Sequence, residues 1–265
     1  MEHPAPGKLR PVTGFASVQL ARNPGPMTLD GTNTWVVRAP GERGCAVIDP
    51  GPSEPEHLRA VAEQGPVSLV LLTHHHGDHT GGVAEFAELT GAPVRAWDAQ
   101  LCRGAEPFED GEQLDAAGIG LRVRATPGHT QDSVSFLAEH DGERVVFTGD
   151  TVLGRGTTVV AHPDGHLGSY MDSLRQLVEL PAGTRALPGH GPDLPDAAEV
   201  AAAYLQHREQ RLDQVRAVVR DRGPEVTARQ VVEIVYADVD RSVWPAAEWS
   251  VQAQLTHLDE RGELA

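Results

Sequence analysis

Short apolar runs recur along the first three quarters of the chain, and each is bounded by glycine, proline or polar residues. Runs of this length and composition predict buried strands. We place the strands at residues 17–20, 34–38, 44–49, 67–73, 94–97, 121–125, 133–138, 144–147 and 184–187. Between them, apolar residues recur with a helical period at 54–64, 82–89 and 170–180. This alternation predicts an α/β fold.

Strand patterns almost disappear after Pro195, which indicates a change of domain. Helices are expected there at residues 197–222, 227–236 and 244–261. Thr227 and Gln230 form a capping box at the start of the second helix, and Gly262 ends the third. We therefore expect an α/β domain at 1–194 and a helical domain at 195–265.

The helical region resembles a winged helix whose wing is cut short. A nucleic-acid-binding role for it would need a basic surface. Residues 191–265 instead contain 8 arginines against 14 acidic residues. We therefore favour a cap that packs over the edge of the first domain.

Composition limits the class of protein. The chain has 265 residues, of which 40% are hydrophobic, so it can bury a large core. No stretch approaches the roughly 18 apolar residues of a membrane span, and residues 1–11 lack the apolar segment of a secretory signal. Cys45 and Cys102 belong to no ligand motif. We expect a cytoplasmic protein without a membrane partner.

The strongest chemical signal is the segment at residues 73–82, which follows an apolar run and contains His74, His76, Asp78 and His79. Imidazole and carboxylate are ligands that suit Zn²⁺, Mn²⁺ or Fe²⁺. A strand that leads into such a loop directs His74 and His76 one way, and Asp78 and His79 another. The spacing therefore divides the ligands between two metal ions.

Three later segments complete the set. His129, Asp150 and His190 each follow an apolar, strand-like run and each adjoin a glycine that permits a sharp turn. A single histidine after a glycine is usually an ordinary turn residue. Four such segments in this order indicate a metal centre.

This order resembles the metallo-β-lactamase-fold hydrolases over about residues 12–192. The resemblance implies a four-layer αβ/βα sandwich with the metal site at one edge, followed by a small helical domain. It also implies that His74, His76 and His129 hold one metal ion, that Asp78, His79 and His190 hold the second, and that Asp150 bridges both. A carboxylate suits that bridging role because it has two oxygens to share.

Further segments narrow the match to the β-lactamase-like protein 2 branch. They lie at residues 23–35, 152–158, 170–174 and 188–192. The branch is similar to single-strand-selective endoribonucleases, and its fungal relatives resemble thioesterases that release polyketides from a carrier protein. The resemblance thus implies the metal-dependent active site but leaves the substrate class open.

The implied chemistry is hydrolysis by a hydroxide that bridges two divalent ions, most simply zinc, with manganese or iron as alternatives. Asp78 is the candidate catalytic residue, because it can orient the hydroxide and carry a proton to the leaving group. Arg155, Tyr170 and His207 are candidates for substrate contact. Thr73, Thr130 and Thr148 are candidates to orient the imidazoles. His75 is interpreted as a spacer.

The formal net charge of −16 bears on the substrate, because RNA binding depends on neutralised phosphates. We therefore favour a small or carrier-bound ester, thioester or lactam. A single-strand-selective endoribonuclease is the alternative, and a non-catalytic metal-binding regulatory module is a second one. The sequence does not determine the oligomeric state.

Overall fold

Two mixed sheets pack face to face in the computed structural model, which describes residues 5–264. The first sheet has the order β1 (Leu9–Pro11), β2 (Ala16–Leu20), β3 (Asn33–Val37), β4 (Cys45–Ile48), β5 (Val67–Leu71) and β6 (Val94–Arg95). The second has the order β11 (Arg185–Pro188), β10 (Glu143–Gly149), β9 (Val134–His140), β8 (Ile119–Ala125) and β7 (Gln113–Ala116). Parallel pairing occurs at β4–β5, β5–β6 and β10–β11, and the other neighbours are antiparallel.

Alternate residues of the central strands face opposite sides, as a pleated strand requires. In β3, Trp35 and Val37 point into the core between the sheets, whereas Val36 packs on the outer face. In β10, Phe147 joins the same inner core and meets the Trp35 ring edge-on at 5.7 Å. These strands are therefore apolar on both faces.

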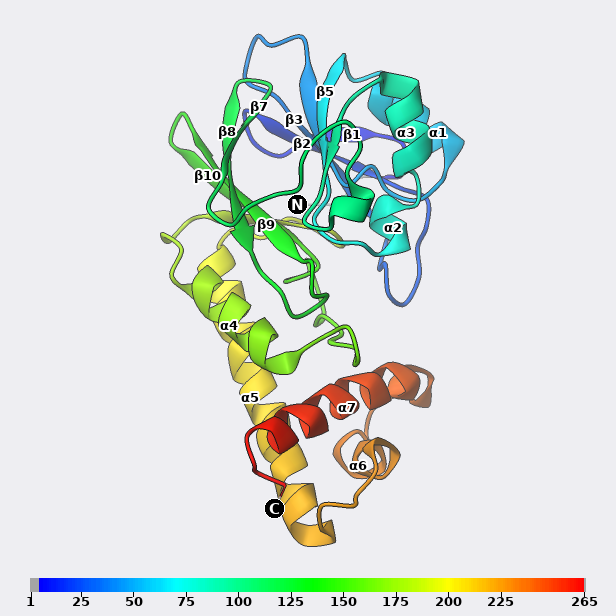
Figure 1. Ribbon diagram of the computed structural model, residues 1–265, viewed down its shortest axis with the longest axis vertical. Helices are drawn as coiled ribbons and strands as arrows, with labels where there is room; N and C mark the ends of the chain where they lie inside the picture. The colour runs from blue at the N-terminus through cyan, green and yellow to red at the C-terminus, as the bar shows by residue number, and fades with distance from the viewer. Residues whose placement is uncertain (1–4, 265) are drawn as a thin grey trace.

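Helices cover both outer faces (Figure 1). Helices α1 (Pro55–Ala62) and α3 (Val83–Thr90) pack on the first sheet through a cluster that includes Leu58 and Phe86. Helix α4 (Leu167–Val178) and the first half of α5 (Ala197–Arg222) pack on the second sheet. The four-layer αβ/βα sandwich is confirmed.

A separate apolar cluster joins the second half of α5 to α6 (Ala228–Val235) and α7 (Trp244–Glu260), which follows the short helix η2 (Arg241–Val243). The capping box at Thr227 is present. Within residues 5–264 no strand follows β11. Figure 1 shows α5 extending from the sandwich to these helices, so one helix contributes to both cores. The domain boundary at 194/195 stays a prediction.

Most predicted elements are confirmed to within a few residues, and α5 matches its predicted range. Five elements were not predicted because they are too short to show a period, namely β1, β7, the single-turn α2 (Gly77–Thr80), the short η1 (Ala99–Leu101) and η2. Among the helices of residues 5–264, none combines the length and apolar character that crossing a bilayer requires. The cytoplasmic location stays a prediction.

Candidate metal centre

Seven side chains meet at one edge of the sandwich because of where their strands end. Strands β8, β10 and β11 run in the same direction, so their carboxyl ends share an edge of the second sheet. His129, Asp150 and His190 follow those ends. The loop after β5 and helix α2 bring the remaining four, His74, His76, Asp78 and His79, from the first sheet.

Three imidazoles form one side of the cluster. The Nδ1 atom of His76 lies 3.1 Å from Nε2 of His74 and 3.1 Å from Nε2 of His129. His74 and His129 are buried. These three nitrogens are close enough to bind one ion.

A second group lies beside the first. Nε2 of His190 is 3.3 Å from Nε2 of His79 and 3.0 Å from Oδ2 of Asp78. Asp150 lies between the groups, with Oδ2 3.7 Å from Nε2 of His129 and 3.3 Å from Nε2 of His190. The structure thus brings together all seven predicted ligands in the two predicted groups.

In four of the imidazoles, a hydrogen bond to the outward nitrogen fixes the tautomer and the nitrogen that faces the cluster. Nδ1 of His129 lies 2.8 Å from the Val159 carbonyl oxygen, and Nδ1 of His190 lies 3.1 Å from that of Gly31. A carbonyl only accepts, so both Nδ1 atoms carry protons in these bonds. When such an imidazole is neutral, its Nε2 directs a lone pair into the cluster.

Asp49 completes this outer layer, and the sequence analysis missed it. Its Oδ2 lies 2.8 Å from Nδ1 of His79 and accepts the Thr73 hydroxyl at 2.7 Å, while Oδ1 accepts the Thr73 amide. Thr73 Oγ1 is therefore free to accept Nδ1–H of His74, which lies 3.0 Å away. Asp49 ends a predicted apolar run and precedes Pro50 and Gly51, so the pattern that located the other ligands also applied here.

Of the three candidate threonines, only Thr73 contacts an imidazole. Thr130 bonds to Asp132 and Ser133, and Thr148 bonds to backbone carbonyls. His75 points away from the cluster. Its side chain is 42% exposed and its Nδ1 lies 2.8 Å from an Asp132 oxygen, as expected for a spacer.

The donor set fits divalent metal ions. Two nitrogens that bind one tetrahedral zinc ion at roughly 2.0–2.1 Å are about 3.3–3.4 Å apart, close to the separations found here. In addition, Oδ1 of Asp150 is buried and has no hydrogen-bond partner. Inward lone pairs and an unpaired carboxylate oxygen repel one another unless a cation or proton lies between them.

The electrostatics of the cluster agree with this interpretation. Burial disfavours protonated His190, but the charge of Asp150 and the hydrogen bonds to Asp150, Asp78 and Gly31 together raise the pKa of His190 to about 11. Burial, reinforced by His129, lowers the pKa of His76 to about 4. Burial also opposes ionisation of Asp150, but His190 and His79 hold its pKa well below the usual range.

The segment at residues 23–33 closes one side of the centre. Asn33 donates its amide to the carbonyls of Pro188 and Gly191 at 3.0 and 2.8 Å, which fixes the loop that carries His190. Thr32 Oγ1 lies 3.4 Å from Asp78 Oδ2. Asn33 is the buried first residue of β3 and supports the loop that carries His190.

Gly189 shows how tightly this loop approaches the centre. A Cβ atom at this position would lie 2.4 Å from Oδ1 of Asp150 and 2.6 Å from Cε1 of His79. Only glycine fits such an approach without displacing a predicted ligand.

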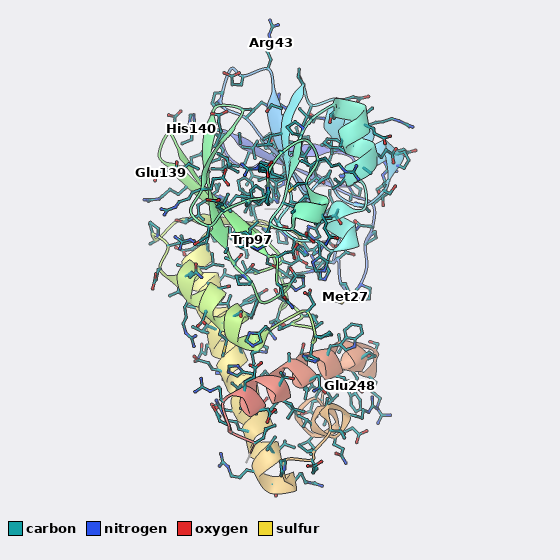
Figure 2. The ribbon with its side chains drawn as sticks, in the orientation of Figure 1. Met27, Arg43, Trp97, Glu139, His140 and Glu248 are labelled. Carbon is teal, nitrogen blue, oxygen red and sulfur yellow. The ribbon has the colours of Figure 1, made fainter. Side chains whose placement is uncertain are left out.

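A cavity of about 190 Å³ opens onto His129 and Asp150. Its walls are mostly apolar and come from the loops at residues 26–29 and 153–159. Met27 is 49% exposed, and Figure 2 shows it on the side of the sandwich that faces α7. Arg155 lines the cavity and forms a two-bond ion pair with Asp30.

The other two candidates for substrate contact lie elsewhere. Tyr170 is fully buried, donates its hydroxyl to the Thr151 carbonyl and lies under the Arg208 guanidinium. It does not line the cavity beside the cluster, and its contact with substrate stays a prediction. It supports the loop after Asp150 from behind. His207 lines a different cavity, next to α7.

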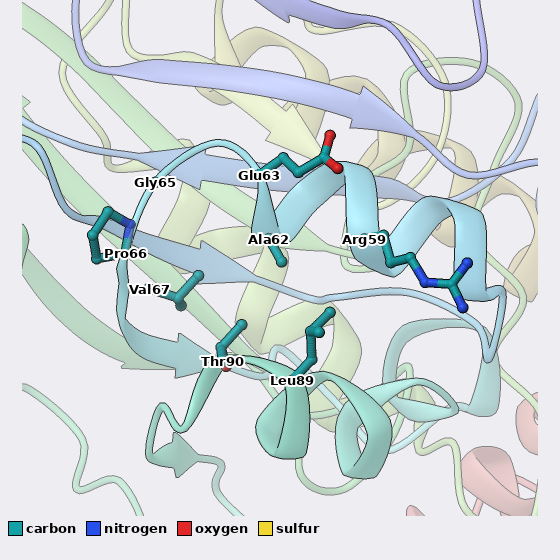
Figure 3. Close-up of a pocket in the computed structure, with 8 residues that line it drawn as sticks. All are labelled: Arg59, Ala62, Glu63, Gly65, Pro66, Val67, Leu89 and Thr90. Atoms are coloured by element: carbon teal, nitrogen blue, oxygen red, sulfur yellow. The ribbon is translucent and has the colours of Figure 1, made fainter.

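A larger hollow of about 380 Å³ between α1 and α3 is remote from this chemistry (Figure 3). It includes Val67 at the start of β5, whereas the histidine loop follows the other end of that strand. None of the seven predicted ligands lines it.

Comparison with known proteins agrees with this geometry. Residues 27–190 match the family model of the metallo-beta-lactamase superfamily. The chain belongs to this superfamily. Its members are metal-dependent hydrolases whose fold binds a dinuclear metal centre, so the protein is such a hydrolase and the non-catalytic alternative is not retained. Residues 227–264 match the beta-lactamase associated winged helix domain.

Individual relatives show which branch of the superfamily the chain is similar to. It is 34% identical to a beta-lactamase-like protein 2 homolog of Caenorhabditis elegans, over 92% of this chain and 83% of the relative. It is 34% identical to the Drosophila melanogaster homolog, over 92% and 88%. It is also 35% identical to the lactamase-like protein aptB of Emericella nidulans, over 84% and 74%. The predicted branch is confirmed.

Solved structures confirm the fold. A beta-lactamase domain protein from Burkholderia ambifaria superimposes with a TM-score of 0.83 at 22% identity, covering 98% of this chain and 90% of that one. TTHA1623, solved in a di-iron-bound form, gives a TM-score of 0.57 at 28% identity, over 68% of this chain and 92% of that one.

We predict that Asp49→Asn weakens metal binding by about 10–100-fold, the usual effect of losing an outer partner of a ligand. Asparagine replaces one carboxylate oxygen by an NH2 group, which cannot accept, so the side chain can no longer take all three bonds from His79 and Thr73. Competition with a fluorescent chelator measures the affinity. Asp141→Asn, at an 84% exposed carboxylate, is the control. Equal affinity of the two variants would show that Asp49 does not support the centre.

Proposed function

We propose that the protein is a dinuclear hydrolase of a small or carrier-tethered acyl substrate, namely an ester, thioester or lactam. The observation that carries this proposal is the small apolar cavity beside His129 and Asp150. Its volume of about 190 Å³ lies below the roughly 300–1,000 Å³ of sites for drug-sized ligands. It suits an acyl chain better than a nucleotide.

We assign the ligands as the two groups of the cluster. His74, His76 and His129 hold one ion, Asp78, His79 and His190 hold the other, and Asp150 contributes to both. Zinc suits this nitrogen-rich set, with manganese and iron as alternatives. When bound, two such ions polarise a substrate oxygen and make water a stronger acid.

Asp78 is the proposed catalytic carboxylate. Its side chain is 27% exposed, so it can contact water at the edge of the cluster. Burial opposes its ionisation, but the bond to His190 together with the charges of His79 and His190 holds the pKa of Asp78 well below the usual range. As an ionised carboxylate, Asp78 can orient an attacking water, accept its proton and pass that proton to the leaving group.

The protein's charge favours an acyl substrate over RNA. A net charge of −16 repels a polyanion at long range and lowers its non-specific affinity. Arg155, the arginine at the cavity, is already paired with Asp30. An acyl group needs only an apolar wall and the metal centre.

Elemental analysis of the purified protein is expected to find close to two divalent ions per chain. The assignment rests on seven ligands, which exceed the four that one tetrahedral ion takes. At most one ion, with no gain in activity on adding metal, would contradict a dinuclear centre.

Asp150→Asn is expected to lower kcat/KM by more than about 100-fold, because losing a ligand should exceed the effect of losing an outer partner. Asparagine keeps the shape of Asp150 but removes its charge and one strong donor oxygen. His75→Ala removes an exposed side chain that faces away from the cluster, so its kcat/KM should stay near that of the wild type. Both are measured at saturating metal. Comparable losses would show that His75 is not a spacer.

The substrate class is tested by measuring kcat/KM on acyl thioesters, lactones and labelled single-stranded RNA. We expect turnover of an acyl substrate that Asp150→Asn abolishes, which excludes a contaminating enzyme. RNA cleavage that Asp150→Asn abolishes, together with acyl turnover at the background rate, would instead identify an endoribonuclease.

A further inference from the structure

A second cavity, of about 230 Å³, lies where the sandwich meets the C-terminal helices. One wall is the segment at residues 157–159, and the opposite walls come from α5, η2 and α7. Its polar lining consists of Thr157, Thr158, His207, Arg208, Arg211 and Ser250. No acidic residue lines it.

The two arginines of this cavity differ from most others in the C-terminal region. Arg216, Arg229 and Arg261 form ion pairs with nearby carboxylates. Within the described part of the chain, neither Arg208 nor Arg211 has a carboxylate within ion-pair distance. A protein with a net charge of −16 therefore keeps two unneutralised guanidinium groups in one cavity.

Polar atoms of the same residues lack partners. Arg208 is 6% exposed, and its Nε has no hydrogen-bond partner although its Nη2 donates to the Thr158 carbonyl. Nδ1 of His207 is buried and also unpaired. Arg211 stacks on Tyr236 and uses Nη1 for Gln214 and the Val235 carbonyl, which leaves its other donors for a ligand.

Burial lowers the pKa of His207, and the charges of Arg208 and Arg211 lower it further. The positive field in the cavity is thus not cancelled by a neighbouring group. An unpaired buried donor beside two guanidinium groups is costly unless an anion occupies the space.

We propose that this cavity binds the phosphate group of a small phosphorylated molecule. Arginine guanidinium groups recognise phosphate by paired, charge-assisted hydrogen bonds, and a phosphate has enough oxygens to accept from both arginines. The hydroxyls of Thr157 and Ser250 add donors. Val239, Val243 and Ala247 form an apolar wall for the organic part of the ligand.

The phosphate site adjoins the metal centre but uses none of its seven proposed ligands. Thr158 donates its hydroxyl to the Asp150 carbonyl at 2.8 Å, and the Val159 carbonyl accepts from His129. Residues 157–159 therefore form a wall shared by the two sites. The proposal does not depend on which substrate the metal centre hydrolyses.

The test is a calorimetric titration of inorganic phosphate into the metal-loaded protein. The variants are Arg211→Gln, Arg208→Lys and, as matched control, Arg220→Gln, which removes the same charge from an exposed position of the same helix. Asp78→Asn reports binding at the metal centre. Thermal melting checks that each variant is folded. Acetate, titrated into the wild type, tests for a carboxylate site.

We expect saturable binding to the wild type, unchanged in Arg220→Gln and Asp78→Asn and at least about tenfold weaker in Arg211→Gln, as the loss of a charge-assisted bond predicts. Arg208→Lys keeps the positive charge but loses the paired N–H donors of the guanidinium group, so this variant should also bind phosphate more weakly. Absence of saturation, wild-type affinity in Arg211→Gln, loss confined to Asp78→Asn, or acetate binding as tight as phosphate would each overturn the proposal.

Discussion

The organisation of this protein depends on one repulsion. Imidazole lone pairs and carboxylates that face the same small space repel one another, and the fold must hold them there. Five imidazoles and two carboxylates meet within hydrogen-bonding distances, and few protons are available between them. The outward nitrogens of four of the imidazoles are bonded to carbonyls, to Asp49 or to Thr73, so these four rings cannot turn away. Such a cluster is stable only around positive charge. The fold thus holds four of the seven proposed ligands in place through bonds outside the cluster.

The sandwich supplies that rigidity through strand direction. Three ligands follow β8, β10 and β11 because these strands point the same way, and the fold brings the loop after β5 to the same edge. The inner core behind the edge is filled by large side chains such as Trp35 and Phe147. Trp35 also donates its indole N–H to the Pro188 carbonyl at 3.1 Å. Core packing and ligand position are therefore linked through the strand that precedes His190.

The sequence was informative where local chemistry determines structure. The capping box at Thr227 and helix α5 were predicted correctly, because each depends on a few neighbouring residues. The seven proposed ligands follow apolar runs and meet in one cluster, and their binding of metal stays a prediction. Asp49 was missed because its partners, Thr73 and His79, are 24 and 30 residues away. The burial of Tyr170 was not predicted, because its helical pattern does not reveal which face meets the second sheet. Contacts between residues that are far apart in the chain cannot be read from a single sequence.

Helix α5 shows why the C-terminal helices belong to the catalytic structure. Tyr204, in its first half, bonds to the backbone of Leu153 and Gly156, and Arg208, one turn later, bonds to the Thr158 carbonyl. Both side chains therefore hold the loop after Asp150, whose Val159 carbonyl in turn orients His129. Removing the C-terminal helices would expose the second half of α5 and loosen this loop. Helix α7 lines the cavity on the other side of residues 157–159, so this segment lies between the metal centre and the C-terminal helices.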